Sequence, residues 1–190
     1  MAQPAVRRAT VEDLQRAPPG SIAELVGGEM NVQPRPAGPH ALAGSVLGEE
    51  LGPPFRSGRG GPGGWVILDE PELHLGEDVL VPDLAGWRSA RAPSLRGAAF
   101  DVAPDWVCEI LSPSSVRWDR LTESEAYARH GVTFLWLIDP AAEVLEAYTL
   151  RERRWLRLGG RSGDDVARIP PFEAIELTLT PLWVREGGVP

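Results

Sequence analysis

The sequence predicts an α/β (α+β) protein in which a mixed central β-sheet is flanked by helices. The runs at residues 79–87 and 105–115 are short, apolar and rich in β-branched and aromatic side chains, which is typical of central strands. The run at residues 132–139 is apolar without interruption, which favours a sheet covered on both faces. Segments with helix start and stop signals lie between these runs, so helices are expected beside the sheet.

The N-terminal half is expected to begin with a short helix and a hairpin. Thr10, followed by two acidic residues, indicates a helix N-terminus, and Pro18 indicates its end. A glycine pair joins two strands within residues 21–34, because glycine permits the positive φ of a tight turn. A second helix begins at Pro39 and is expected to stop at Gly52, where two prolines follow. After a glycine-rich connector, an antiparallel meander is predicted from strands at residues 65–68, 73–75 and 79–87.

The C-terminal half is expected to pass from strand to helix to strand. The run at residues 105–115 ends in a serine-rich turn that caps a helix reaching His130, and Gly131 provides its C-terminal stop. The remaining predicted elements are a strand at 132–139, a hairpin from 143–150 and 154–158, edge strands around 166–169 and 174–179, and an apolar end at 182–184.

Length and composition indicate a single folded domain. With 190 residues, 43% hydrophobic residues and seven Trp, the chain is large enough to bury a core without disulfides or metal. We expect one domain over residues 1–190, with a core from about 13 to 184. No apolar run of the length needed to cross a membrane is present, and no secretory segment begins the chain, so a cytoplasmic protein without membrane contact is expected.

Charge and cysteine content exclude several classes of function. The net charge of −8 argues against a surface that coats nucleic acid, although a local site remains compatible with it. All 19 basic residues are Arg. The one cysteine, Cys108, excludes a disulfide framework, and a zinc site is not expected with only three His. No G-x-S-x-G motif indicates a serine hydrolase.

Two acidic residues, Asp83 and Glu109, lie inside the apolar runs and need an explanation. A buried carboxylate is costly unless it is paired. If the two runs are neighbouring strands, residues of matching parity place both carboxylates on one face, where they could hold a divalent cation, and Cys108 then faces the other way. The alternative is structural: Asp83 as a turn residue after Pro82, and Glu109 in an ion pair. His40, in the first turn of a predicted helix, is expected to be a satisfied surface residue.

Several separate motifs follow one another along the chain: Val81-Pro82-Asp83, the stretch EILSPS from Glu109, Tyr127 followed by Gly131-Val132, and WLIDP from Trp136. In this order they resemble the bacterial Uma-type restriction endonuclease family. The resemblance covers about residues 13–183 and implies the restriction-endonuclease-like fold of the PD-(D/E)xK nuclease superfamily, whose acidic residues on adjacent strands bind Mg²⁺.

The resemblance also implies a site. Asp83 matches the Asp of the PD element, Glu109 matches the second acidic residue, and Glu29 matches the last residue of the family's I-D-G-E stretch, in which Gly27 replaces Asp. These three residues would hold Mg²⁺ (or Mn²⁺), and the expected reaction is metal-assisted hydrolysis of DNA phosphodiester bonds. The resemblance therefore implies DNA as a partner. It also implies a homodimer, because many nucleases of this fold act as dimers.

The chain departs from the family at its lysine. Leu111 occupies the motif's usual Lys position, and the family instead places Lys in a helical D-x-x-x-K-x-x-x-Y pattern. Here that pattern runs from Asp119 to Tyr127, with Glu123 in place of the Lys. The exchange reverses a charge where a cation would stabilise the reacting phosphate.

Two hypotheses follow from this exchange. In the first, the chain is a Mg²⁺-dependent endonuclease in which Arg120, or Arg117 before it, supplies the missing positive charge, although Arg cannot act as a base. The alternative for these arginines is pairing with acidic residues on a solvated helix face. In the second hypothesis, the chain is a catalytically silent protein of the same fold that binds a nucleic-acid or protein partner.

Overall fold

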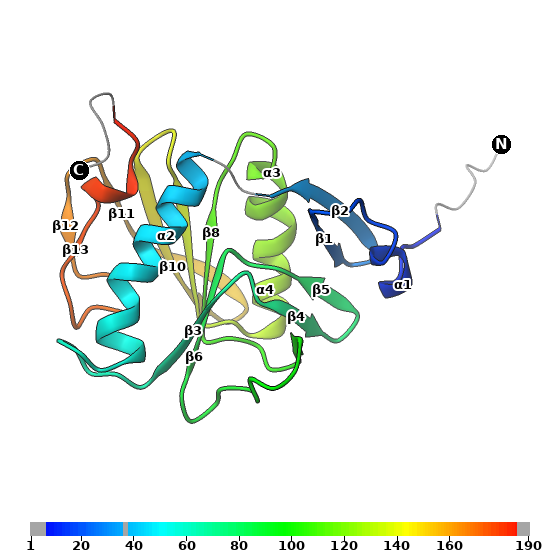
Figure 1. Cartoon of the computed structure of the whole chain (residues 1–190), viewed down its shortest axis with the longest axis horizontal. Coiled ribbons are helices and arrows are strands. Elements are labelled where there is room, and N and C mark those ends of the chain that lie inside the picture. The colour runs from blue at the N-terminus through cyan, green and yellow to red at the C-terminus, as the bar shows by residue number, and fades with distance from the viewer. Residues whose placement is uncertain (1–6, 36–37, 186–190) are drawn as a thin grey trace.

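A computed structural model describes residues 7–35 and 38–185 and has a six-stranded mixed sheet at its centre (Figure 1). Its strand order is β11-β10-β9-β8-β6-β3. Only the β8–β9 pair is parallel, and the other neighbours are antiparallel. The strands are β3 (Trp65–Asp69), β6 (Leu84–Arg88), β8 (Trp106–Ile110), β9 (Phe134–Asp139), β10 (Val144–Arg151) and β11 (Arg154–Ser162).

Two smaller sheets accompany the central one. The first has the order β2-β1-β5-β4-β7, and the second pairs β12 with β13. Their strands are β1 (Ser21–Val26), β2 (Glu29–Pro34), β4 (Glu72–Leu75), β5 (Asp78–Leu80), β7 (Ala99–Phe100), β12 (Val166–Ala167) and β13 (Leu177–Thr178).

The helices are short, and two of them contain π-helical segments. They are α1 (Val11–Leu14), α2 (Pro39–Leu51) continued by η1 (Gly52–Arg56), α3 (Val116–Trp118) continued by η2 (Asp119–Glu123) and α4 (Ser124–His130), and η3 (Thr180–Leu182). Among the helices of the described ranges, none has the length and apolar character that a membrane crossing needs.

The central sheet is covered on both faces, as its uninterrupted apolar strands predict. On one face, residues of α2, η1 and the C-terminal segment pack against Trp106, Cys108 and Trp136. On the other face, residues of α4 and the smaller sheet pack against Val107 and Leu135. Figure 1 shows α2 and α4 as separate helices beside the central strands. The alternation along β8 confirms that Cys108 and Glu109 point to opposite faces.

The predicted strand at residues 79–87 is in fact two strands that belong to different sheets. Residues up to Leu80 form β5 in the smaller sheet, and the chain enters the central sheet as β6 at Leu84. Pro82 has no amide hydrogen to donate to a ladder, and the Val81 N–H is bonded instead to the Glu24 carboxylate. Of the predicted meander, the antiparallel pairing of β4 with β5 is confirmed, whereas β3 pairs with β6 and not with β4.

Two other boundaries differ from the sequence prediction. The helix expected to stop at Gly52 continues for a further π turn, which contains both prolines. This extension carries Phe55 into the core. Near the C-terminus, the two expected edge strands pair with each other and are not part of the central sheet. Leu182 and Trp183 are buried as expected, whereas Val184 is exposed.

Phe172 is the centre of an aromatic cluster on the α2 face of the sheet. Its ring centroid lies 4.6 Å from that of Phe55, 4.9 Å from Trp65, 4.8 Å from Trp106 and 5.6 Å from Trp136. The C-terminal segment therefore contributes the side chain that joins η1, β3, β8 and β9.

We expect Phe172→Ala to lower the free energy of unfolding by about 3–5 kcal/mol, because it leaves a cavity among these four rings. Urea unfolding followed by Trp fluorescence measures the change. Leu158→Ala, on the exposed side of β11, is the control and should change stability by less than about 1 kcal/mol. A loss below 1 kcal/mol in Phe172→Ala would contradict the central position of this ring.

Candidate active site

The pairing of β6 with β8 brings the two predicted carboxylates together. Leu84 pairs with Cys108 and Ala85 with Val107 in an antiparallel register, so Asp83 lies opposite Glu109. The Asp83 N–H points to Glu109 Oε2 at 3.4 Å, and the Ile110 N–H donates to Asp83 Oδ2 at 2.7 Å. The sequence-based inference of neighbouring strands with both carboxylates on one face is therefore confirmed.

Glu109 is almost completely buried and is held by a tyrosine. The Tyr127 hydroxyl, from α4, donates a hydrogen bond of 2.5 Å to Glu109 Oε1. Burial, together with the nearby charges of Asp83 and Asp119, raises the pKa of Glu109 well above its ordinary value. This carboxyl group is thus unfavourable as an anion unless a cation binds beside it.

Glu24, from the centre of β1, is a third carboxylate at this position. It is buried, it accepts the Val81 N–H on Oε1 at 2.8 Å, and it accepts the Trp118 indole N–H on Oε2 at 3.1 Å. Glu24 therefore ties the smaller sheet to the start of the helix that follows β8.

The π-helical segment η2 supplies two further acidic residues, Asp119 and Glu123. Both are buried, and the Ser115 hydroxyl donates to Asp119 Oδ2 at 2.7 Å. Burial raises the pKa of Asp119 to about 7, with the Ser115 bond opposing the shift and the charges of Asp83 and Glu24 adding to it. Burial and the adjacent carboxylates of Glu109 and Glu24 raise the pKa of Glu123 well above its ordinary value.

His40, from the first turn of α2, faces the acidic cluster. Its Nε2 lies 3.2 Å from Asp83 Oδ2, and both side chains are only 16% exposed. Burial lowers the pKa of His40, but the hydrogen bond and charge of Asp83 outweigh it, and the pKa is raised overall. The prediction that His40 is a satisfied surface residue is wrong, because α2 packs against β3 and β8 and its first turn places this side chain against Asp83.

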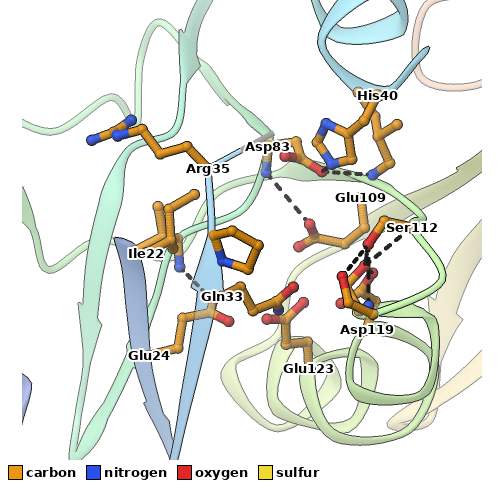
Figure 2. A pocket seen from close by; sticks show the side chains of 15 residues that line it. Ile22, Glu24, Gln33, Arg35, His40, Asp83, Glu109, Ser112, Asp119 and Glu123 are labelled. Atoms are coloured by element: carbon orange, nitrogen blue, oxygen red, sulfur yellow. Dashed lines mark hydrogen bonds and ion pairs between the residues drawn. The ribbon is translucent and has the colours of Figure 1, made fainter. Parts of the chain in front are cut away.

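These side chains line a hollow of about 220 Å³ between β1, β2, the segment that precedes β6, β8 and the helix that contains η2 (Figure 2). A second hollow of about 680 Å³, along α2 and β3, adjoins it. The two share four lining residues: Arg35, His40, Asp83 and Ile110. Asp83 and His40 are thus accessible from a groove that is larger than the acidic hollow alone.

The structure does not bring every predicted residue to this hollow. Glu29 is exposed at the start of β2 and lines a separate hollow with Asp78 and Arg129. Arg120 donates to Glu146 of β10 at 2.8 Å and does not line the acidic hollow. Glu123 does line it. Of the two glutamates of the β1–β2 hairpin, Glu24 lines the acidic hollow and Glu29 does not, and Arg120 also lies outside it.

The donor set fits a hard divalent cation in part. Such ions bind carboxylate oxygens and keep several waters, so two protein carboxylates are enough. Asp83 and Glu109 provide these, and the excess of carboxylates over cationic groups lining the hollow favours a bound cation. Within residues 7–35 and 38–185, no group of three or more His, Cys, Asp or Glu side chains is already arranged around one ion position.

The fold and this site define a nuclease-like α+β protein. A solved structure entitled as that of a "putative nuclease belonging to DUF820" from Anabaena variabilis ATCC 29413 is similar to it, with a TM-score of 0.73 and 22% identity. The similarity covers 91% of this chain and 96% of that one. The model of the Uma2 family, described as "Putative restriction endonuclease", matches residues 10–180. The chain belongs to this family. A search of the curated proteins gives no match.

Sequence reasoning missed Glu24 and His40 as site residues. Glu24 interrupts the apolar stretch IAELV, as Asp83 and Glu109 interrupt their apolar runs. A buried carboxylate is costly unless it is paired, so Glu24 also needed an explanation. His40 carried no comparable signal, because a polar residue in the first turn of a helix is ordinary.

The raised pKa of Asp119 predicts that the protein loses stability as the pH rises. Between about 3.8 and 7, the folded protein keeps a proton that the unfolded chain releases, so rising pH favours unfolding. The free energy of unfolding should therefore fall with rising pH, and we expect Asp119→Asn to remove about 1.4 kcal/mol per pH unit from this slope between pH 5 and 7. Urea unfolding at several pH values measures the slope.

The exposed Asp101 provides the control, and Asp101→Asn should keep the slope of the wild type. An unchanged slope in Asp119→Asn would show that Asp119 is ionised throughout this range.

Proposed function

We propose that this protein is a divalent-metal-dependent endonuclease that hydrolyses DNA phosphodiester bonds at Asp83 and Glu109. The observation that carries the proposal is the register of β6 and β8, which places these two carboxylates opposite each other at the edge of a groove. Membership of a restriction endonuclease family and the nuclease-like fold support the choice of reaction.

Each carboxylate is already oriented by the protein. The Ile110 N–H donates to Asp83, and the Tyr127 hydroxyl donates to Glu109. These hydrogen bonds orient both carboxylate groups and so set the direction of their remaining lone pairs. A Mg²⁺ or Mn²⁺ ion held by this pair would lower the pKa of a bound water and neutralise phosphate charge. The groove beside α2 gives a phosphodiester chain access to Asp83.

A second function, that of a catalytically silent binding module, is favoured by Glu123. The D-x-x-x-K-x-x-x-Y pattern brings Asp119, Glu123 and Tyr127 to the site, and the middle position carries a carboxylate instead of an ammonium group. Glu123 is buried beside Glu109, so this exchange adds negative charge where the reacting phosphate would need positive charge. Arg120, held by Glu146, offers no substitute.

Cleavage of supercoiled plasmid and single-stranded DNA in Mg²⁺ or Mn²⁺ tests the proposal. We expect the wild type to cut and Asp83→Ala to lose at least about 100-fold in rate, because one of the two protein ligands of the ion is removed. We expect Glu123→Lys to cut faster than the wild type, since it places an ammonium group beside Glu109. Gel electrophoresis of nicked and linear products measures the rates.

Glu29→Gln is the matched control, because Glu29 is a glutamate of the same hairpin as Glu24 but lies outside the hollow. It should cut at the wild-type rate. No cleavage by the wild type together with cleavage by Glu123→Lys would support the silent module. Cleavage that persists in Asp83→Ala would contradict the proposed site.

A further inference from the structure

Within the described part of the chain, His40 provides the side-chain nitrogen that contacts the proposed metal-binding pair. Its Nε2 lies 3.2 Å from Asp83 Oδ2. Two ligands that bind one octahedral ion at about 2.1 Å, at right angles, are separated by about 3 Å. The imidazole nitrogen and the carboxylate oxygen therefore already have the spacing of neighbouring ligands on one ion.

The position of His40 is fixed by elements that also form the site. Pro39 occupies the first position of α2, and the residues of this helix that face the sheet, Ala43, Leu47 and Leu51, are fully buried. Asp83 is fixed in turn by the Ile110 N–H, which occupies one lone pair of Oδ2. The His40 imidazole lies 3.2 Å from the same oxygen and hydrogen-bonds to its second lone pair, so an ion would take the place of the Nε2 proton between the two atoms.

His40 also lies where an ion would be needed. It lines both the acidic hollow and the larger groove. Figure 2 shows its ring beside Asp83, with Glu109 nearby. The His40 side chain is 16% exposed, which leaves it accessible to an ion that enters through the groove.

We propose that His40 is a ligand of the catalytic ion together with Asp83, and that the site for this reason prefers Mn²⁺ to Mg²⁺. This inference rests on the proposed function. Imidazole nitrogen suits transition metals, whereas Mg²⁺ prefers oxygen ligands and water. His40 and Asp83 offer one nitrogen and one oxygen at ligand spacing, and water together with Glu109, after a shift of its side chain, would complete the coordination.

Mn²⁺ binding to the full chain, freed of any histidine tag, tests this inference without an activity assay. Electron paramagnetic resonance of free Mn²⁺ gives the affinity, and spin-echo modulation reports a nitrogen bound to the ion. We expect one imidazole nitrogen in the wild type, whose modulation changes when the protein is labelled with ¹⁵N-histidine. We expect Mg²⁺ to displace Mn²⁺ only in at least about tenfold excess.

In His40→Gln, the nitrogen signal should disappear and the Mn²⁺ affinity should fall at least about tenfold. His74→Gln is the matched control, because His74 also contacts a carboxylate, Glu72, at 2.6 Å but lies outside both hollows of the site. It should retain the signal and the affinity of the wild type. Asp83→Asn should lose most of the binding.

The outcomes separate this inference from the proposed function. Mn²⁺ that binds the wild type, is lost in Asp83→Asn and shows no nitrogen modulation would overturn the role of His40 and leave the Asp83 and Glu109 site standing. A wild type that binds no Mn²⁺ would overturn both. The ¹⁵N-labelled wild type gives its answer without any substitution, so a poorly folded variant does not weaken the test.

Discussion

The antiparallel register of β6 and β8 is the constraint on which the rest of the site depends. With Leu84 opposite Cys108, Asp83 and Glu109 share one face of the sheet. A slip of one residue would turn the β8 carboxylate to the aromatic face, where Cys108 is buried without a polar partner for a charge. Pro82 ends the smaller sheet just before Asp83, so both sheets meet at the site and β1 can supply Glu24.

Burying the acidic cluster is energetically unfavourable, and hydrogen bonds and protonation reduce this penalty. Glu24, Glu109, Asp119 and Glu123 are each less than 5% exposed. Side-chain donors from Trp118, Tyr127 and Ser115 satisfy some of their oxygens. Burial also raises the pKa of three of these carboxyl groups, so protons neutralise charges that the protein leaves without a basic partner. Bound cations and protons are therefore expected to compete for this site.

The aromatic cluster around Phe172 lies on the opposite face of the sheet. Four aromatic rings surround Phe172 there, and this cluster joins the C-terminal segment to η1, β3, β8 and β9. A rigid core on one face lets β6 and β8 hold their carboxylates in place on the other. The family match, which runs to residue 180, includes the segment that carries Phe172.

Apolar patterns in the sequence predicted the α+β class, most strand and helix positions, and the proximity of Asp83 and Glu109. The order of the motifs predicted the family. Both signals can be read directly along the chain. The sequence did not predict that residues 79–87 divide between two sheets, that η1 extends α2, or that His40 enters the site and Glu29 does not. By itself the sequence determined which strands are apolar and which carboxylates interrupt them. Only the tertiary structure decided which side chains meet, because packing α2 and the β1–β2 hairpin against the sheet depends on contacts between residues far apart in the chain.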